Sequence, residues 1–332
     1  MPVERVVLAV TKPPERPVVV VLRALGLGDL LTAVPALRAV RRGLPGHELV
    51  LLTPHRFAGL VRHAALADRV VPIDATTTLP ASLPPSPGPC DVAVNLHGRG
   101  PVSHRLLMAL HPSRLVAFAC RDVVVDGPLW RPGEHEVERW VRLVSAAGFG
   151  ADSADLRIQP PDRPIAGLAR GATILHPGAA APARRWPVER WVQLAIAEQA
   201  SGRDVVVTAG PGERSLAERV VVAARLPPSR AIVLDDMLDL VSIVAAAARV
   251  VCGDTGVAHV ATAVGTPSVV LFGPIPPHEW GPPTSTIHRV LWHGRRGDPH
   301  AAVADPGLLT ISVAEVRRAV STLPPSGRCA MT

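Results

Sequence analysis

Three short segments contain residue types that suit phosphate binding or proton transfer, and the heptapeptide at 253–259 is the most informative of them. It reads Gly-Asp-Thr-Gly-Val-Ala-His and lies between a predicted strand and a predicted helix. The first turn of a helix has free amide groups and the positive end of the helix dipole, so it attracts anions. Thr255 adds a hydroxyl, Gly256 lets a phosphate approach the backbone, and His259 lies one turn further on. The segment therefore indicates a phosphate site, although Asp254 and Thr255 would also serve as ordinary helix caps.

A second segment combines a glycine loop with two adjacent arginines. His176-Pro177-Gly178-Ala179 follows a predicted strand, and Arg184-Arg185-Trp186-Pro187 precedes the next predicted helix. Because guanidinium groups bind phosphate oxygens bidentately, this loop suits a diphosphate. The competing interpretation is a solvated basic loop in which Trp186 only packs against the helix.

The third segment, Gly26-Leu27-Gly28-Asp29, follows the first predicted strand. It is not a dinucleotide fingerprint, because Leu31 occupies the third glycine position. A carboxylate at the tip of such a loop could act as a general base toward a ligand held by another part of the chain. Asp29 is therefore the candidate base, and a helix cap is the alternative that its position alone favours.

Strands and helices alternate along the chain, which predicts parallel sheets built from strand–helix–strand units. The expected strands are 18–22, 49–53, 70–73, 91–96 and 115–119, then 173–175, 204–208, 232–234, 249–252 and 268–272. The expected helices are 30–40, 103–110, 134–147, 188–200, 213–224, 238–248 and 256–264, with a last helix from Ser312.

The proline-rich segment 152–171 divides this pattern into two halves of similar size, and 76–89 is expected to be a surface loop. We therefore expect an α/β protein with two Rossmann-like domains, 1–160 and 161–332, that face each other across a cleft. The last helix could pack back on the first domain.

Composition excludes several classes of protein. The 332 residues carry a net charge of +7, but Lys12 is the only lysine, the arginines are scattered and aromatic residues are only 3% of the chain. A nucleic-acid surface would need clustered basic residues with stacking aromatics, so we expect no nucleic-acid partner. No apolar run is long enough to span a bilayer, and the first ten residues do not resemble a signal peptide.

The four cysteines, Cys90, Cys120, Cys252 and Cys329, have no metal-binding spacing. Reduced thiols and a cytoplasmic protein are the simple expectation. We also expect no metal, because Asp235 and Asp236 are adjacent and do not form an Asp-x-Asp motif.

Taken together and in order, these segments resemble glycosyltransferase family 9, the lipopolysaccharide heptosyltransferases. A weaker match is the segment 135–139, His-Glu-Val-Glu-Arg. The blocks that carry the resemblance are 25–31 with 35–37, then 176–179 with 184–187 and Trp191, and finally 254–256 with His259, Ala263, Gly265, Pro267 and 271–274.

The resemblance implies the GT-B fold and an inverting, metal-independent transfer of a sugar, most simply heptose from ADP-heptose, to an acceptor hydroxyl. Asp29 falls at the family's proposed base, and Arg184 falls where the family usually has a lysine near the donor diphosphate. Arg185 and the 255–259 segment would share that role, while Gly210 and Glu213 would lie near the ribose and 236–238 near the base. The expected substrate-binding residues are Gly28, His176, Gly178, Arg184, Arg185, Gly210, Glu213, Met237, Asp254, Thr255, Gly256 and His259.

The acceptor is left open by the sequence: it could be a glycan, a lipid-linked sugar or a small metabolite. A lipid acceptor would imply peripheral attachment to the inner face of the membrane. The alternatives to a transferase are a non-catalytic partner protein that binds nucleotide sugars and a GT-B nucleotide-sugar epimerase.

Overall fold

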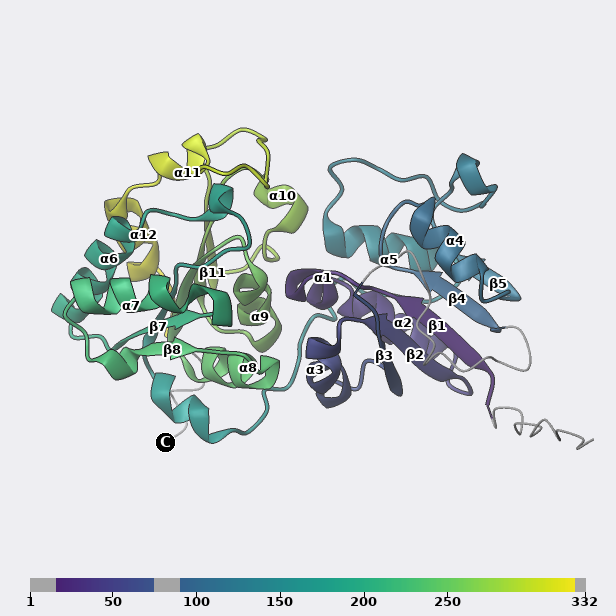
Figure 1. Cartoon of the computed structure of the whole chain (residues 1–332), viewed down its shortest axis with the longest axis horizontal. Coiled ribbons are helices and arrows are strands. Elements are labelled where there is room, and N and C mark those ends of the chain that lie inside the picture. Colours follow the sequence, from purple (N-terminus) through teal and green to yellow (C-terminus); the bar gives the residue numbers. More distant parts are fainter. Residues whose placement is uncertain (1–15, 75–89, 326–332) are drawn as a thin grey trace, which may run out of the picture.

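Two parallel β-sheets lie side by side and form two α/β domains, as the sequence predicts (Figure 1). The structure is a computed structural model and describes residues 16–74 and 90–325. The expected loop at 76–89, the first ten residues and Cys329 lie outside the described residues.

The first domain has a five-stranded sheet in the order β3-β2-β1-β4-β5. Its central strand consists of valines and one leucine, and Val20 lies opposite Val50 on one side and Ala93 on the other. Such runs are typical of strands that helices cover on both faces. The strands are β1 (Val18–Leu22), β2 (Glu48–Thr53), β3 (Arg69–Pro72), β4 (Val92–Asn95) and β5 (Arg114–Val116), and the helices are α1 (Leu27–Thr32), α2 (Val34–Gly43), α3 (Ala58–His63), α4 (Val102–Met108) and α5 (Glu136–Ala146).

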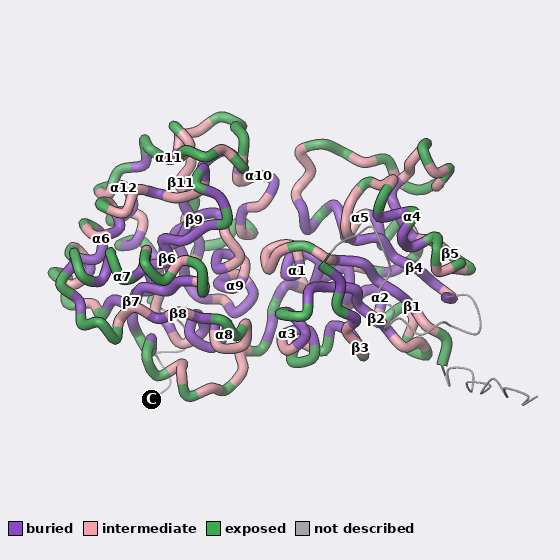
Figure 2. Tube along the Cα trace, viewed as in Figure 1, coloured by how far each residue is buried: buried purple, intermediate pink, exposed green. Residues whose placement is uncertain are grey.

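The second domain has a six-stranded sheet in the order β11-β10-β9-β6-β7-β8. Buried residues follow the strands of both sheets (Figure 2). The strands are β6 (Thr173–His176), β7 (Val205–Ala209), β8 (Ala231–Val233), β9 (Arg249–Gly253), β10 (Ser268–Leu271) and β11 (His288–Leu291), and the helices are α6 (Val188–Ala200), α7 (Arg214–Ala223), α8 (Met237–Ala246), α9 (Gly256–Val264), α10 (Pro277–Trp280), α11 (Pro306–Thr310) and α12 (Val313–Ser321).

The expected helix over 30–40 is two helices in the structure, and they meet at Ala33. Pro35 explains the break, because it has no amide hydrogen and its ring excludes the carbonyl one turn earlier. The sequence also did not predict the short elements α3, α10, α11 and β11. Among the described residues, no helix is both long and apolar enough to cross a bilayer.

Helices α1 and α9 join the two domains. A Cβ atom placed on Gly28 would lie 2.7 Å from the His259 ring, and one on Gly256 would lie 2.9 Å from Leu27. The chain between the domains is also packed: Leu156 and Ile158 are buried, and the Ile158 amide donates to the Ala263 carbonyl at 2.9 Å. The first turns of the two helices are therefore held in direct contact.

The final helix, α12, packs within the second domain. Val316 and Val320 are buried in the same apolar cluster as Trp186 and Leu194. Its apolar face is thus covered by α6, and the alternative in which it packs back on the first domain is wrong for this helix. The boundary at 160/161 stays a prediction.

Candidate functional site

The residues singled out from the sequence follow the carboxyl ends of parallel strands in both sheets. Asp29 lies in the helix that follows β1, while the other segments follow β6, β7, β8 and β9. In open α/β sheets, ligands bind outside the carboxyl ends of the strands. The contact of α1 with α9 brings these two edges together, so the candidate site lies between the domains.

Asp29 is in the first turn of α1, and its side chain is 24% exposed. One carboxylate oxygen, Oδ2, accepts from the Gly26 amide at 3.0 Å, so the residue caps its own helix. The other oxygen, Oδ1, lies 3.3 Å from Nη2 of Arg23. Asp29 therefore serves as a helix cap and also keeps part of its side chain exposed.

Burial raises the pKa of Asp29 above its ordinary value; Arg23 opposes this effect, and the nearby Glu136 carboxylate adds to it. A raised pKa makes the carboxylate a better proton acceptor than an exposed aspartate, provided that it remains ionised at the working pH.

Arg23 and Glu136 were not among the residues predicted for the site. Arg23 is 1% exposed and Glu136 is 4% exposed, and they pair at 2.9 Å. The available signal was the charge itself, because Arg23 directly follows the apolar strand β1. Charged residues are almost never fully buried without a partner.

Side-chain donors that do not cap the helix lie at the start of α9. Thr255 is the N-cap residue, yet its hydroxyl makes no cap hydrogen bond to the helix and instead interacts with the neighbouring Cys252 thiol. Nε of Arg184 is buried and unpaired in the part of the chain that the structure describes, while its Nη1 reaches the Asp254 carbonyl at 3.4 Å. Because buried donors are normally satisfied, this arrangement suits an anionic ligand.

Asp254 is buried beside these donors. Burial raises its pKa to about 6; Arg184 opposes the shift, and the Asp29 carboxylate of the other domain adds to it. The two carboxylates therefore interact across the interface between the domains.

We expect Asp254→Asn to stabilise the protein near pH 8 by about 2 kcal/mol, and the gain to vanish near pH 4. Below its unfolded pKa, the carboxyl is protonated in both states and has no charge to bury. As the pH rises from the unfolded pKa to the folded pKa of about 6, the wild-type protein loses stability that the amide keeps, and above that pH the difference is constant. Urea unfolding across this pH range, with the exposed Asp204→Asn as control, measures the difference; an equal gain at both ends of the range would contradict the assignment.

His259 lies between the domains, with its ring against Gly28 and edge-to-face with Trp280 at 5.9 Å. Burial lowers the pKa of His259 to about 4, and charge effects from His135, Glu136 and Arg23 modify the shift. The ring is therefore neutral near pH 7, so it can offer one hydrogen bond but no cation to a phosphate.

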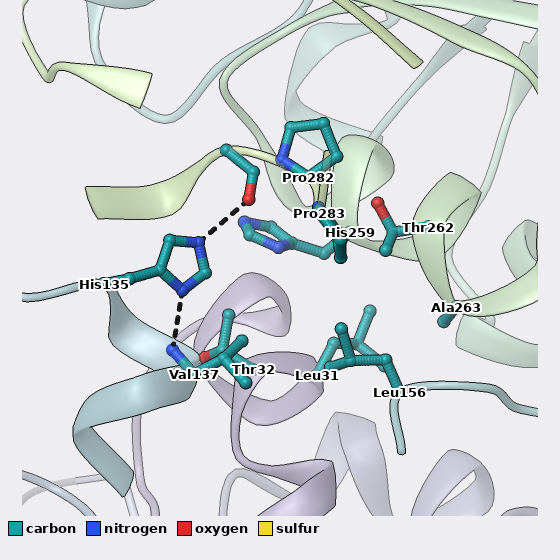
Figure 3. Close-up of a pocket in the computed structure, with 11 residues that line it drawn as sticks. Leu31, Thr32, His135, Val137, Leu156, His259, Thr262, Ala263, Pro282 and Pro283 are labelled. Atoms are coloured by element: carbon teal, nitrogen blue, oxygen red, sulfur yellow. Dashed lines mark hydrogen bonds between the residues drawn. The ribbon is translucent and has the colours of Figure 1, made fainter. Parts of the chain in front are cut away.

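A small cavity of about 20 Å³, room for one water molecule, lies behind this ring (Figure 3). His135, at the start of α5, faces the same cavity. Its Nε2 bonds to the Gly281 carbonyl of the second domain at 3.0 Å, and its Nδ1 accepts from the Val137 amide at 3.2 Å. His135 thus links the domains directly.

Arg185 occupies a different environment from Arg184. Its Nε donates to the Ala179 carbonyl at 2.9 Å, and its Nη2 lies 3.5 Å from a carboxylate oxygen of Glu213. The Glu213 carboxylate in turn lies directly over Gly178, where any side chain would collide with it. The structure therefore brings Gly178, Arg185 and Glu213 together. Arg185, one of the two arginines predicted to bind the diphosphate, already pairs with a carboxylate of the protein.

The remaining predicted residues line the same edge of the second sheet. Gly210 precedes a short 3-10 turn, Pro211–Glu213, and Met237 is the first residue of α8. His176 ends β6 and is buried, with Nδ1 3.0 Å from the Thr208 hydroxyl. Burial lowers the pKa of His176 to about 4, so it is a neutral residue that joins two strand ends.

Within 16–74 and 90–325, no three His, Cys, Asp or Glu side chains gather as a metal site would require. The candidate site is thus one carboxylate from the first domain opposite arginine, hydroxyl and helix-terminus donors of the second.

Comparisons with known proteins bear on the family and the fold of the chain. The model of glycosyltransferase family 9 (heptosyltransferase) matches residues 123–301, more than half of the chain. Lipopolysaccharide heptosyltransferase 2 of Escherichia coli is 30% identical over 156 residues, which cover 46% of this chain and 43% of that protein. The alignment therefore spans less than half the length of this relative.

Two solved structures share the fold along most of the chain. A family 9 glycosyltransferase from Veillonella parvula has a TM-score of 0.75 and 19% identity, covering 93% of this chain and 97% of that one. The E. coli heptosyltransferase WaaC with ADP has a TM-score of 0.66 and 19% identity, covering 91% and 98%. These similarities show the GT-B fold.

Proposed function

The chain belongs to glycosyltransferase family 9, and on this premise we propose that it transfers a sugar from a nucleoside-diphosphate donor to an acceptor hydroxyl with inversion at the anomeric carbon. The observation that carries the proposal is the pairing of two different chemistries across the domain interface. Asp29 provides a carboxylate, and the second domain provides the amino-terminal end of α9 beside Arg184, whose Nε has no partner among the described residues.

In the proposed reaction, Asp29 takes the proton of the acceptor hydroxyl. The acceptor oxygen then bonds to the anomeric carbon as the bond from that carbon to the diphosphate oxygen breaks. Negative charge grows on the departing diphosphate, where Arg184, the Thr255 hydroxyl and the amides of α9 can stabilise it. Because these groups are already in place, we propose that the transfer needs no metal.

We propose distinct roles for the two arginines. Arg184 has a free Nε and lies beside Asp254 at the start of α9, so it would bind the diphosphate. Arg185 is paired with Glu213, so it would hold that carboxylate near the donor ribose, close to Gly178 and Gly210. Met237 would lie near the base, and neutral His259 would donate one hydrogen bond.

ADP-heptose is the donor that we propose. The support is the E. coli relative, a lipopolysaccharide heptosyltransferase, and the similar structure solved with ADP. For the acceptor we propose a hydroxyl of a glycan, a lipid-linked sugar or a small metabolite. We place the enzyme in the cytoplasm, at the inner face of the membrane if its acceptor is a lipid.

ADP is expected to raise the Tm of the protein more than UDP, GDP or dTDP, with or without magnesium. A ligand present at about 100 times its Kd stabilises the folded state by about 2.7 kcal/mol, which a thermal-shift assay resolves easily. The same screen with EDTA tests the proposed independence from metal.

Each outcome of the screen has a distinct meaning. Preference for another nucleotide would overturn the donor but keep the transferase, and a signal that EDTA abolishes would overturn metal independence. Binding of ADP without transfer from ADP-heptose to any tested acceptor would favour a non-catalytic binding protein.

A further inference from the structure

The buried guanidinium of Arg23 contacts Asp29, the proposed base. Arg23 lies at the end of β1 and is 1% exposed, and its nitrogens donate to groups from several segments. Nε reaches the Asp29 carbonyl at 2.8 Å, and Nη1 reaches the Leu96 carbonyl at 2.6 Å. Nη2 lies 2.9 Å from Glu136, 3.3 Å from the Asp29 carboxylate and 3.3 Å from the Thr32 hydroxyl. Arg23 therefore fixes both the backbone and the side chain of Asp29.

Glu136 competes with Asp29 for the same guanidinium nitrogen, and its contact is the shorter of the two. We propose that Arg23 and Glu136 are positioning residues for Asp29, and that Glu136 draws the guanidinium away from this carboxylate so that it stays oriented but remains free to accept a proton. This inference rests on the proposed function of Asp29 as the base.

Glu136 is itself held rigidly by the first turn and core of α5. Its Oε1 accepts from the Trp140 indole at 2.8 Å, and its Oε2 pairs with Arg139. The Arg23 guanidinium also stacks over the Trp140 ring at 4.8 Å. The charges of the two arginines and the two carboxylates thus balance, and Asp29 is the most exposed of the four side chains.

Charged and titratable groups on other elements also lie near Asp29, but they do not take over the roles of Arg23 and Glu136. In the second domain, the Asp254 carboxylate interacts with Asp29, and Arg184 partly compensates its charge. His97, after β4, accepts from the Ala24 amide, and burial together with Arg23 lowers its pKa to about 4. His259 is neutral near pH 7 for a similar reason. Arg23 and Glu136 are therefore the buried charges of the first domain that set the proton affinity of Asp29.

The arrangement matters for the proton that the acceptor loses. A carboxylate in a close ion pair with arginine is a weak base, whereas one without any partner would not keep its orientation in a half-buried site. Sharing Arg23 between two carboxylates avoids both problems.

Two substitutions should move the pH dependence of kcat in opposite directions. Glu136→Gln removes a negative charge, so Arg23 interacts more strongly with Asp29 and lowers its pKa. The acid limb of the kcat profile should then shift by about one pH unit to lower pH, and the maximum kcat should fall about threefold. Arg139→Gln removes a positive charge beside Glu136, so the negative charge of Glu136 acts more strongly on Asp29 and raises its pKa. The acid limb of the kcat profile should then shift by about half a pH unit to higher pH. General loss of structure cannot produce shifts of opposite sign.

Trp140→Phe is the matched control, because it removes one hydrogen bond to Glu136 but no charge. It should lower the Tm while the acid limb stays within about 0.2 units of the wild-type value. Arg23→Lys keeps the charge but loses the planar guanidinium that donates to several groups at once. The kcat should therefore fall about tenfold, with little change in KM for the donor. Equal losses in all four variants with an unmoved acid limb would overturn the proposal.

Direct titration of the Asp29 carboxyl by ¹³C NMR separates this inference from the proposed function. If the wild-type protein transfers no sugar but Glu136→Gln still lowers the measured pKa of Asp29, then the base assignment fails and the electrostatic arrangement stands. If transfer depends on Asp29 but its pKa is the same in both proteins, then the inference fails alone. A Glu136→Gln protein that does not fold leaves Arg139→Gln, measured in the same way, to decide.

Discussion

Asp29→Asn is expected to lower kcat by about 10³-fold while the protein still binds ADP, because general-base catalysis typically contributes 10² to 10⁴. The amide cannot take the acceptor proton. It can still accept the hydrogen bond from the Gly26 amide, which caps α1. The loss should therefore appear in the chemical step and leave the Kd for ADP within about threefold of the wild-type value.

Asp155→Asn provides the control for this substitution. Asp155 also belongs to an ion pair, with Arg38 and Arg42, but it lies in the segment between the domains. Its replacement should leave kcat unchanged. Activity of Asp29→Asn above about one tenth of wild type would remove Asp29 as the base and leave it as a helix cap.

The position of the candidate site follows from local patterns in the sequence, and the structure places most of the predicted strands and helices where these patterns put them. Apolar strands followed by glycine loops predict strand ends, and parallel sheets place such ends at one edge. This reasoning was enough to bring Asp29 and the 253–259 segment to the same region. The direct contact of α1 with α9 depends on Gly28 and Gly256, whose missing side chains let the two helices approach.

What the sequence could not show is how charges combine over long separations. Arg23 and Glu136 are 113 residues apart, and nothing in either local pattern indicates that they pair. The same holds for Arg184 and Arg185, which are neighbours in sequence but have different partners, Asp254 for one and Glu213 for the other. The neutral state of His259 is also a tertiary effect, since it arises from burial between domains.

Some secondary structure was missed for a simpler reason. Helix α10 has four residues and α11 has five, and both begin with proline, so neither is long enough to show helical periodicity. The edge strand β11 contains a histidine and an arginine among its four residues, which obscures a buried pattern.

Arg184→Ala should cause the second large loss, about 10²-fold in kcat, together with weaker binding of ADP. The guanidinium lies at the start of α9, where its Nη1 reaches the Asp254 carbonyl, and its Nε has no partner among the described groups. Charge on the leaving diphosphate increases in the transition state, so the lost interaction should affect kcat more than binding. Steady-state kinetics with ADP-heptose, combined with calorimetry of ADP, separates the two effects.

Arg185→Ala is the matched comparison, because it removes the same charge one residue away. Arg185 already contacts Glu213 and the Ala179 carbonyl, so its loss should act through Glu213 and appear mainly as a higher KM for the donor. Arg184→Lys should recover part of the activity, since charge is kept but bidentate geometry is lost. If Arg185→Ala proves the more damaging to kcat, the roles of the two arginines must be exchanged, and the donor diphosphate would then lie toward Glu213 and away from Asp254.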